Sequence, residues 1–307
     1  MSSLQTDPPG RAGYVFAIVS SVAAGTATVV GKWNLREISA LVMACCMFSV
    51  ATGALSVAWL PYGGLKRVFG HSRRGWFWIA LFTATSLAAV WSFWAGVRQM
   101  DPTLAAFLNR FEVPVAILMG VIFLGERFTR IETVGVVLSL AGIAIMRATL
   151  RVEYSTGFWL VLLGALFFGT TEFVSKIAVR HVEPIALAYL RNMFMAAAYW
   201  IVVTSSGRDL SGLERVWPGV LAVGLLGPIL SRMMYLKALK RMDLSKVAVI
   251  SQSQPVFVVL IALTFLGQVP TFREVIGGIC LISGCLLMIV AHQRRQPQDA
   301  ARLQTGG

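Results

Sequence analysis

Five charged residues lie inside long apolar stretches of this 307-residue chain. A charge near the middle of a lipid-embedded helix costs about 2.5–3.5 kcal/mol on insertion scales, so each such side chain needs a polar neighbour or water. Carboxylates in such places can carry protons, and guanidinium groups bind carboxylates through two parallel hydrogen bonds. These residue types therefore predict a site for a small charged solute. The five residues are Arg110, Glu112, Glu172, Arg191 and Arg232.

The other polar residues give no support for an enzyme. The sequence has no Gly-rich phosphate loop, and its three His and four Cys show no metal-ligand spacing. We therefore expect no metal, no cofactor and no catalytic residues. The polar segments between the apolar stretches are too short to hold a nucleotide-binding domain. Movement of a solute by this protein would therefore draw on a concentration or ion gradient and not on ATP. Glu112 and Glu172 are the candidates for proton coupling.

Composition places the chain in a membrane. Hydrophobic residues make up 57% and charged residues 13%, with a mean hydropathy of +0.73. A soluble domain carries about 25% charged residues, so this chain could not cover a globule of its size with polar surface. The net charge of +13 comes from Lys and Arg placed mostly between apolar stretches. That placement is typical of membrane orientation and argues against nucleic-acid binding.

The apolar stretches predict an all-α membrane protein with ten transmembrane helices. A bilayer core takes roughly 20 apolar residues as helix. The polar tails 1–12 and 292–307 are expected to be cytoplasmic and 293–307 to be disordered, because Lys and Arg concentrate in the loops on the side of the N terminus. We expect the cell (inner or plasma) membrane. The predicted spans are 13–32, 39–60, 75–97, 103–124, 131–150, 156–178, 184–203, 217–239, 244–266 and 275–291.

The two halves of the chain, 13–150 and 156–291, resemble each other. Each half holds five helices, an odd number, so the second half must enter the membrane upside down. Inverted repeats are typical of carriers that work by alternating access, with the cargo bound near the midplane between the halves. The matched pairs include Gly25 and Gly169, Lys32 and Lys176, Asp101 and Asp243, Glu132 and Glu274, Gly135 and Gly277, and Gly142 and Gly284.

The segments Phe123-Leu-Gly-Glu-Arg-Phe-Thr and Val134-Gly-Val-Val-Leu-Ser-Leu-Ala-Gly-Ile resemble the close of a repeat in EamA-type members of the drug/metabolite transporter superfamily. The second copy has Gln268 where an acidic residue is usual. The resemblance covers essentially residues 13 to 291. It implies a secondary carrier, frequently an exporter of amino acids or related metabolites. It also places Arg191 where that family often has an arginine.

The fourth and ninth spans carry matching polar patches. Asn109, Arg110 and Glu112 correspond to Ser251, Gln252 and Gln254, and a proline follows each patch. Glu112 lies about 13 Å into its span at 1.5 Å per residue, close to the midplane. Arg110 and Glu112 are two residues apart on the predicted helix, so we expect them to point to different faces and to have different partners. We expect both patches to line a central cavity and to bind cargo.

The remaining site candidates each have a structural alternative. Glu172 and Arg232 could pair as a gate or form part of the site, while a local pair of Glu172 with Lys176 is the alternative. Arg191 could bind a cargo carboxylate or hold neighbouring helices. Trp94 and Tyr235 could stack on a planar cargo or serve packing. The recurring glycines are expected to allow close helix approach.

The combination of carboxylates and arginines favours a zwitterionic cargo. The leading prediction is a secondary exporter of a small charged or zwitterionic metabolite such as an amino acid. An uptake carrier for a vitamin- or nucleotide-like solute and a multidrug efflux carrier share the architecture. A membrane scaffold or lipid-handling protein would not need matched polar patches.

Overall fold

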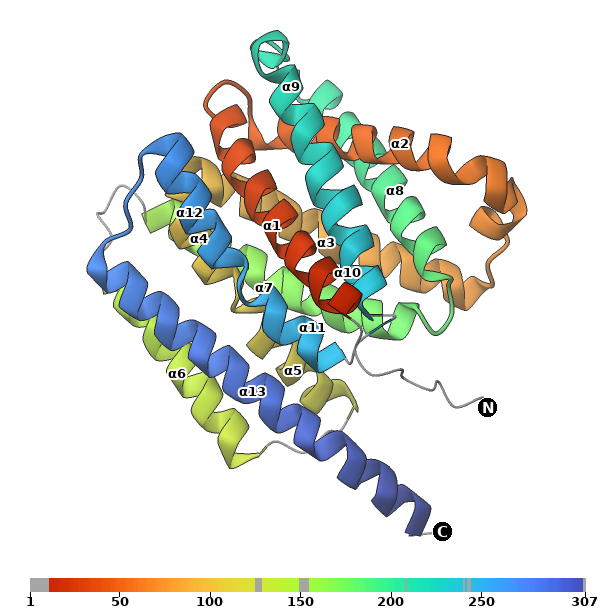
Figure 1. Ribbon diagram of the computed structural model, residues 1–307. Helices are drawn as coiled ribbons and strands as arrows, with labels where there is room; N and C mark the ends of the chain where they lie inside the picture. Colours follow the sequence, from red (N-terminus) through yellow and green to blue (C-terminus); the bar gives the residue numbers. More distant parts are fainter. Residues whose placement is uncertain are drawn as a thin grey trace.

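A computed structural model describes residues 11–124, 129–148, 155–207, 209–239, 241 and 244–305. All regular structure in these residues is helical (Figure 1). Ten helical segments are long and apolar enough to cross a membrane, which confirms the predicted number of spans. The first repeat holds α1 (Arg11–Asn34), α2 (Ala40–Phe69), α3 (Arg73–Gln99), α4 (Pro102–Asn109), α5 (Glu112–Leu124) and α6 (Arg130–Ala148). The second holds α7 (Ser155–Ala178), α8 (Pro184–Ser205), α9 (Leu213–Gly224), η2 (Leu225–Ser231), α10 (Arg232–Leu239), α11 (Leu244–Ser251), α12 (Gln254–Leu266) and α13 (Phe272–Thr305).

The fourth and ninth spans are each broken in the middle. α4 ends at Asn109 and α5 begins at Glu112, while α11 ends at Ser251 and α12 begins at Gln254. The two breaks fall at matched positions of the repeats, within the two polar patches. The eighth span is interrupted by the π-helix η2, whereas its counterpart in the first repeat is the uninterrupted α3.

Glycines bring the two repeats into close contact. A Cβ atom on Gly135 would lie 2.8 Å from the carbonyl oxygen of Gly284, and one on Gly277 would lie 2.7 Å from that of Gly142. Because Gly135 matches Gly277 and Gly142 matches Gly284, superposing one repeat on the other turns each of these contacts into the other. A pseudo-two-fold axis therefore passes between α6 and α13, which run side by side in Figure 1. The expected packing role of these glycines is confirmed.

Matched capping boxes begin α6 and α13. The Thr129 N–H donates to Oε2 of Glu132, and the Glu132 N–H donates to the Thr129 hydroxyl. Thr271 and Glu274 form the same reciprocal pair. Because each box satisfies two backbone donors that a helix start leaves free, it explains why this acidic position recurs in both repeats.

The two repeats pack differently on the two sides of the membrane. We call the side on which α1 begins the N-terminal side. In the half away from it, α4 packs on α12, and Ala106, Val258 and Ala262 are buried there. Among the described residues, the symmetry mates α5 and α11 in the N-terminal half make no comparable contact. Ala116, the mate of Val258, accordingly stays partly exposed. Among the described residues, the fourth and ninth spans are therefore packed together in the half that holds α4 and α12 and more loosely in the half that holds α5 and α11.

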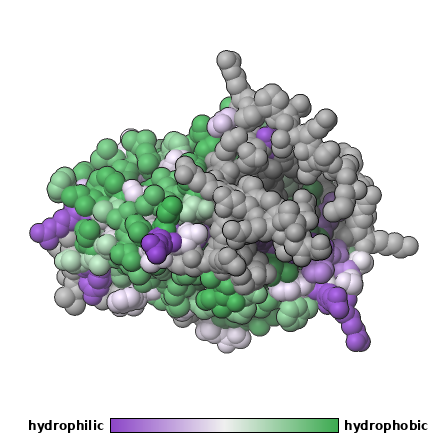
Figure 2. Space-filling model, turned by 90° about the horizontal axis from the view of Figure 1, so that it is seen from below, coloured by the Kyte–Doolittle hydropathy of each residue, from purple (hydrophilic) through white to green (hydrophobic). Residues whose placement is uncertain are grey.

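The surface suits a lipid environment. Hydrophobic residues cover much of the described surface in Figure 2, and hydrophilic residues gather in a few clusters. Val57, Phe77 and Phe265 are among the large apolar side chains left exposed.

One prediction about the ends of the elements is wrong. The tail from Gln293 was expected to be disordered, yet α13 continues to Thr305. Its Gln, Arg and Ala residues are strong helix formers, and they extend a helix that the apolar span has already nucleated.

Candidate functional site

The break in the fourth span lets Arg110 and Glu112 pair with each other. Nη2 of Arg110 lies 3.3 Å from Oε1 of Glu112, so the expectation of separate partners is wrong. That expectation assumed a continuous helix. In the structure the Arg110 N–H donates to the Phe107 carbonyl and the Val113 N–H to the Arg110 carbonyl, both three residues back. This tighter turn brings the two side chains together.

At each break a proline removes the usual helical donor of the carbonyl four residues earlier. Pro114 has no N–H for the Arg110 carbonyl, which accepts instead from the Val113 N–H at 3.1 Å and from the Cys285 thiol at 3.3 Å. Pro255 likewise has none for the Ser251 carbonyl, which accepts from Nη1 of Arg110 at 3.3 Å. The carbonyls that prolines free on both sides of the pseudo-two-fold axis are thus used in contacts between spans.

The polar patches meet at Arg110. Its Nη2 donates to Oε1 of Gln254 at 2.9 Å, and its side chain is 6% exposed. Asn109 donates to the second carboxylate oxygen of Glu112 at 3.3 Å. Gln252 is buried, and its Oε1 accepts no hydrogen bond from the described residues. All six residues of the predicted patches thus lie at the two breaks.

A second ion pair joins α7 to α10. Nη1 of Arg232 lies 3.2 Å from Oε1 of Glu172, which confirms the predicted pairing. The side chains are 31% and 40% exposed, far more than that of Arg110. α7 packs mainly on α3 and α5, while α10 packs mainly on α1. The pair therefore bridges elements that are not close packing neighbours, in the looser half of the fold.

Tyr235 lies beside this second pair, one helical turn beyond Arg232. The Arg232 guanidinium carbon is 5.8 Å from the centroid of the Tyr235 ring. The two ion pairs also act on each other electrostatically, because Glu112 interacts with both Glu172 and Arg232. Tyr235, Glu112 and Glu172 thus belong to one polar cluster.

A π-helical segment immediately precedes Arg232. The Ser20 hydroxyl of α1 donates to the carbonyl of Ser231, the last residue of η2, at 2.8 Å. No residue of η2 is buried. Wide turns of this kind frequently occur at functional sites.

Arg191 is held by its neighbours. Its Nε donates to the buried Ser86 hydroxyl at 2.8 Å, and its guanidinium lies over Phe82 and Phe48. It also interacts electrostatically with Glu172 and Arg232. Arg191 therefore lies at the edge of the cluster, and its direct contacts with Ser86, Phe48 and Phe82 hold neighbouring helices together.

The Trp94 side chain is packed among other residues of the fold. It is buried, its ring meets Phe93 edge to face at 5.4 Å, and a Cβ on Gly31 would collide with it. The structure thus gives Trp94 a place between α1 and α3.

The sequence prediction missed Cys285 and Ser20. Both act through hydrogen bonds to main-chain carbonyls, which residue types do not reveal. The proline that follows each patch was the available signal that a carbonyl would be free.

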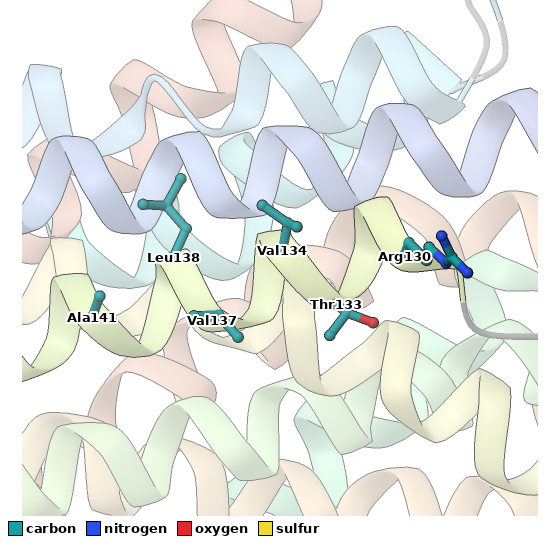
Figure 3. A pocket seen from close by; sticks show the side chains of 6 residues that line it. All are labelled: Arg130, Thr133, Val134, Val137, Leu138 and Ala141. Atoms are coloured by element: carbon teal, nitrogen blue, oxygen red, sulfur yellow. The ribbon is translucent and has the colours of Figure 1, made fainter.

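An apolar groove on the exposed face of α6 is separate from this cluster (Figure 3). All its lining residues belong to one helix, and Val134 and Val137 are more than half exposed. It therefore belongs to the surface that meets lipid. The lining residues are Arg130, Thr133, Val134, Val137, Leu138 and Ala141.

Ten apolar spans, two similar five-span halves and ion pairs within the spans together define a multi-pass membrane protein. A family model described as the EamA-like transporter family matches residues 11–148 and again 155–290, and the chain belongs to this family.

Several known proteins are similar in sequence or fold. Protein RarD of Salmonella typhi is 28% identical over 56% of this chain and 57% of its own length. A probable terminal-alkyne amino-acid exporter of Streptantibioticus cattleyicolor is 24% identical over 78% of this chain and 80% of its own. An uncharacterized transporter of Synechocystis is 20% identical over 78% and 73%. Among the solved structures that match, a crystal structure has a TM-score of 0.66 at 14% identity and covers 92% of this chain and 98% of its own.

Proposed function

We propose that this protein is a secondary transporter that exports a small zwitterionic metabolite, such as an amino acid, across the cell membrane. The Glu172–Arg232 pair is the observation that carries the proposal. An ion pair so deep in the apolar spans is costly unless it meets water or a polar ligand. Its partial exposure between loosely packed elements supports a hydrated path that leads to it.

The chemistry of the pair suits a zwitterion. A cargo carboxylate can replace Glu172 on the Arg232 guanidinium, and a cargo ammonium group can replace Arg232 on Glu172. Each exchange keeps both charges paired, so binding avoids the cost of an isolated charge within the apolar spans. The name of the Streptantibioticus relative, a probable amino-acid exporter, is consistent with this cargo.

The unequal packing of the two halves supports alternating access. We take repeats 13–150 and 156–291 as the two bodies that move relative to each other. In this structure they contact each other through α4 and α12, while α5 and α11 make no comparable contact among the described residues. If α5 packed on α11 and α4 separated from α12, the protein would open on the opposite side of the membrane. With both termini in the cytoplasm, this structure is the state that faces inward.

Energy would come from a gradient. Glu112 and Glu172 lie in the cluster between Arg110, Arg232 and Tyr235. Protonation of either carboxylate would remove the partner of an arginine and so alter the charge that the cargo meets. We assign proton coupling to these two residues.

Reconstituted vesicles test the proposal. Purified protein in vesicles preloaded with unlabelled L-amino acids should accumulate the same amino acids in labelled form by exchange. Glu172→Gln and Arg232→Gln should abolish exchange, while the lipid-facing control Val137→Ala should not. Exchange of a lipophilic cation dye but of no amino acid, or full amino-acid exchange by both charge variants, would overturn the proposal.

A further inference from the structure

The Arg110 guanidinium joins the two broken spans. It starts from the break between α4 and α5 and reaches the break between α11 and α12, where it contacts the Ser251 carbonyl and the Gln254 side chain. Its own carbonyl is held by Cys285 of α13. One residue thus fastens three spans at the pseudo-two-fold axis.

Arg110 is poorly suited to bind cargo. Both of its terminal nitrogens are engaged, Nη1 by Ser251 and Nη2 by Gln254 and Glu112. Its side chain is 6% exposed, against 31% for Arg232. Its Nε has no hydrogen-bond partner among the described residues but is buried away from any open surface, whereas Arg232 offers a partly exposed guanidinium.

The bond to Ser251 follows from the proline placed four residues later. A helix with Ala in place of Pro255 would use the N–H of that residue to satisfy the Ser251 carbonyl. With proline there, the partly buried carbonyl lacks its helical donor, and Arg110 supplies another. The break and the arginine therefore depend on each other.

The two breaks lie where the packed half of the fold meets the loose half. On one side of them α4 packs on α12, and on the other α5 and α11 make no comparable contact among the described residues. A contact at this junction can persist while the segments on either side exchange their packing.

We propose that Arg110 is a positioning residue, the pivot about which the fourth and ninth spans rock, and that it does not bind the cargo. This inference rests on the proposed transport function. In this proposal Arg232 binds the carboxylate of the cargo, and Arg110 holds the two broken spans together so that they move as a pair.

Kinetics separate a pivot from a cargo ligand. In amino-acid exchange, Arg110→Gln should lower the maximal rate about ten-fold or more, with KM within about two-fold of wild type in the folded protein. Arg110→Lys keeps the charge but loses the planar fork, and should restore part of the rate. A large rise in KM with Arg110→Gln, or an unchanged rate, would overturn the assignment.

A second substitution separates positioning from plain stability. Arg110→Gln leaves the Ser251 carbonyl without its donor and should lower the melting temperature, and adding Pro255→Ala should recover much of it. The double variant should remain slow in exchange, because its two spans are no longer tied together. If exchange recovers along with the melting temperature, Arg110 is only a structural partner.

A cargo-free measurement tests the pivot even if amino acids are the wrong cargo. Ala106→Cys with Val258→Cys places thiols in the buried cluster between α4 and α12. Oxidation in membranes should cross-link this pair in the wild-type background, and the yield should fall several-fold with Arg110→Gln. The parent protein, with its four native cysteines, gives the baseline. An unchanged yield would contradict the pivot. In contrast, a normal cross-link response without any amino-acid exchange would contradict the proposed cargo alone.

Discussion

Gly142 of α6 lies directly against Gly277 of α13. A Cβ atom on Gly142 would come 2.5 Å from the Gly277 carbonyl oxygen, and one on Gly277 would come 2.7 Å from the Gly142 carbonyl. Both contacts are with backbone, which cannot move aside as a side chain can. The two helices are therefore held at a distance that only glycine permits.

Gly142→Val should destabilise the protein by about 1–3 kcal/mol or more, because a bulky side chain must push two helix backbones apart. The melting temperature and the monodisperse fraction in size-exclusion chromatography measure the loss. Val137→Leu, on the lipid-facing side of the same helix, is the matched control and should change little. Equal stability of Gly142→Val and the control would contradict the proposed close contact.

Glu172→Gln and Arg232→Gln should stop transport while changing stability by less than about 1 kcal/mol, because the pair is partly exposed. Exchange rate and melting temperature, measured on the same preparations, check both parts. The swapped variant Glu172→Arg with Arg232→Glu should fold but not transport, since the two charges lie the wrong way round for the cargo. Unfolding of either single variant would show that the pair is structural.

Glu132→Ala should cost about 1 kcal/mol, because the Thr129 N–H loses its acceptor at the start of α6. Glu132→Gln keeps an acceptor oxygen and should retain most of the stability. Thermal unfolding in detergent compares the two variants. Equal losses in both would assign the effect to the negative charge and not to the cap.

Both termini should lie in the cytoplasm, as the distribution of basic residues indicates. A reporter that is active only outside the cytoplasm, fused after residue 295, should stay silent. The same reporter inserted at Gly207, between α8 and α9, should be active. The reverse pattern would invert the topology and make the looser half of the fold face outward.

The spans and the repeats could be predicted from the sequence because both depend on local patterns. A run of apolar residues long enough to cross the bilayer needs no knowledge of its neighbours. Pro114 and Pro255 likewise marked the positions of the two helix breaks. The predicted pair of Glu172 and Arg232 followed from depth and charge alone.

The details of the site could not be predicted in the same way. The pairing of Arg110 with Glu112 depends on the tightened turn between α4 and α5, and an ideal helix places those side chains apart. The bond from Arg110 to Ser251 joins residues 141 positions apart, through a main-chain atom that every residue type carries. The difference in packing between α4–α12 and α5–α11 could not be predicted either, because the two repeats are similar in sequence and give no reason for one pair to pack more closely.

The two capping boxes have a consequence for how the chain is inserted during synthesis. Thr129 and Glu132 start α6 on one side of the membrane, and Thr271 and Glu274 start α13 on the other. Since the same four-residue signal begins a helix in either direction, it carries no information about which way the nascent helix enters the bilayer. That decision must come from residues outside the boxes, such as the basic loops. The ancestral five-helix unit could therefore invert its orientation by changing loop charges alone, with its helix starts left intact.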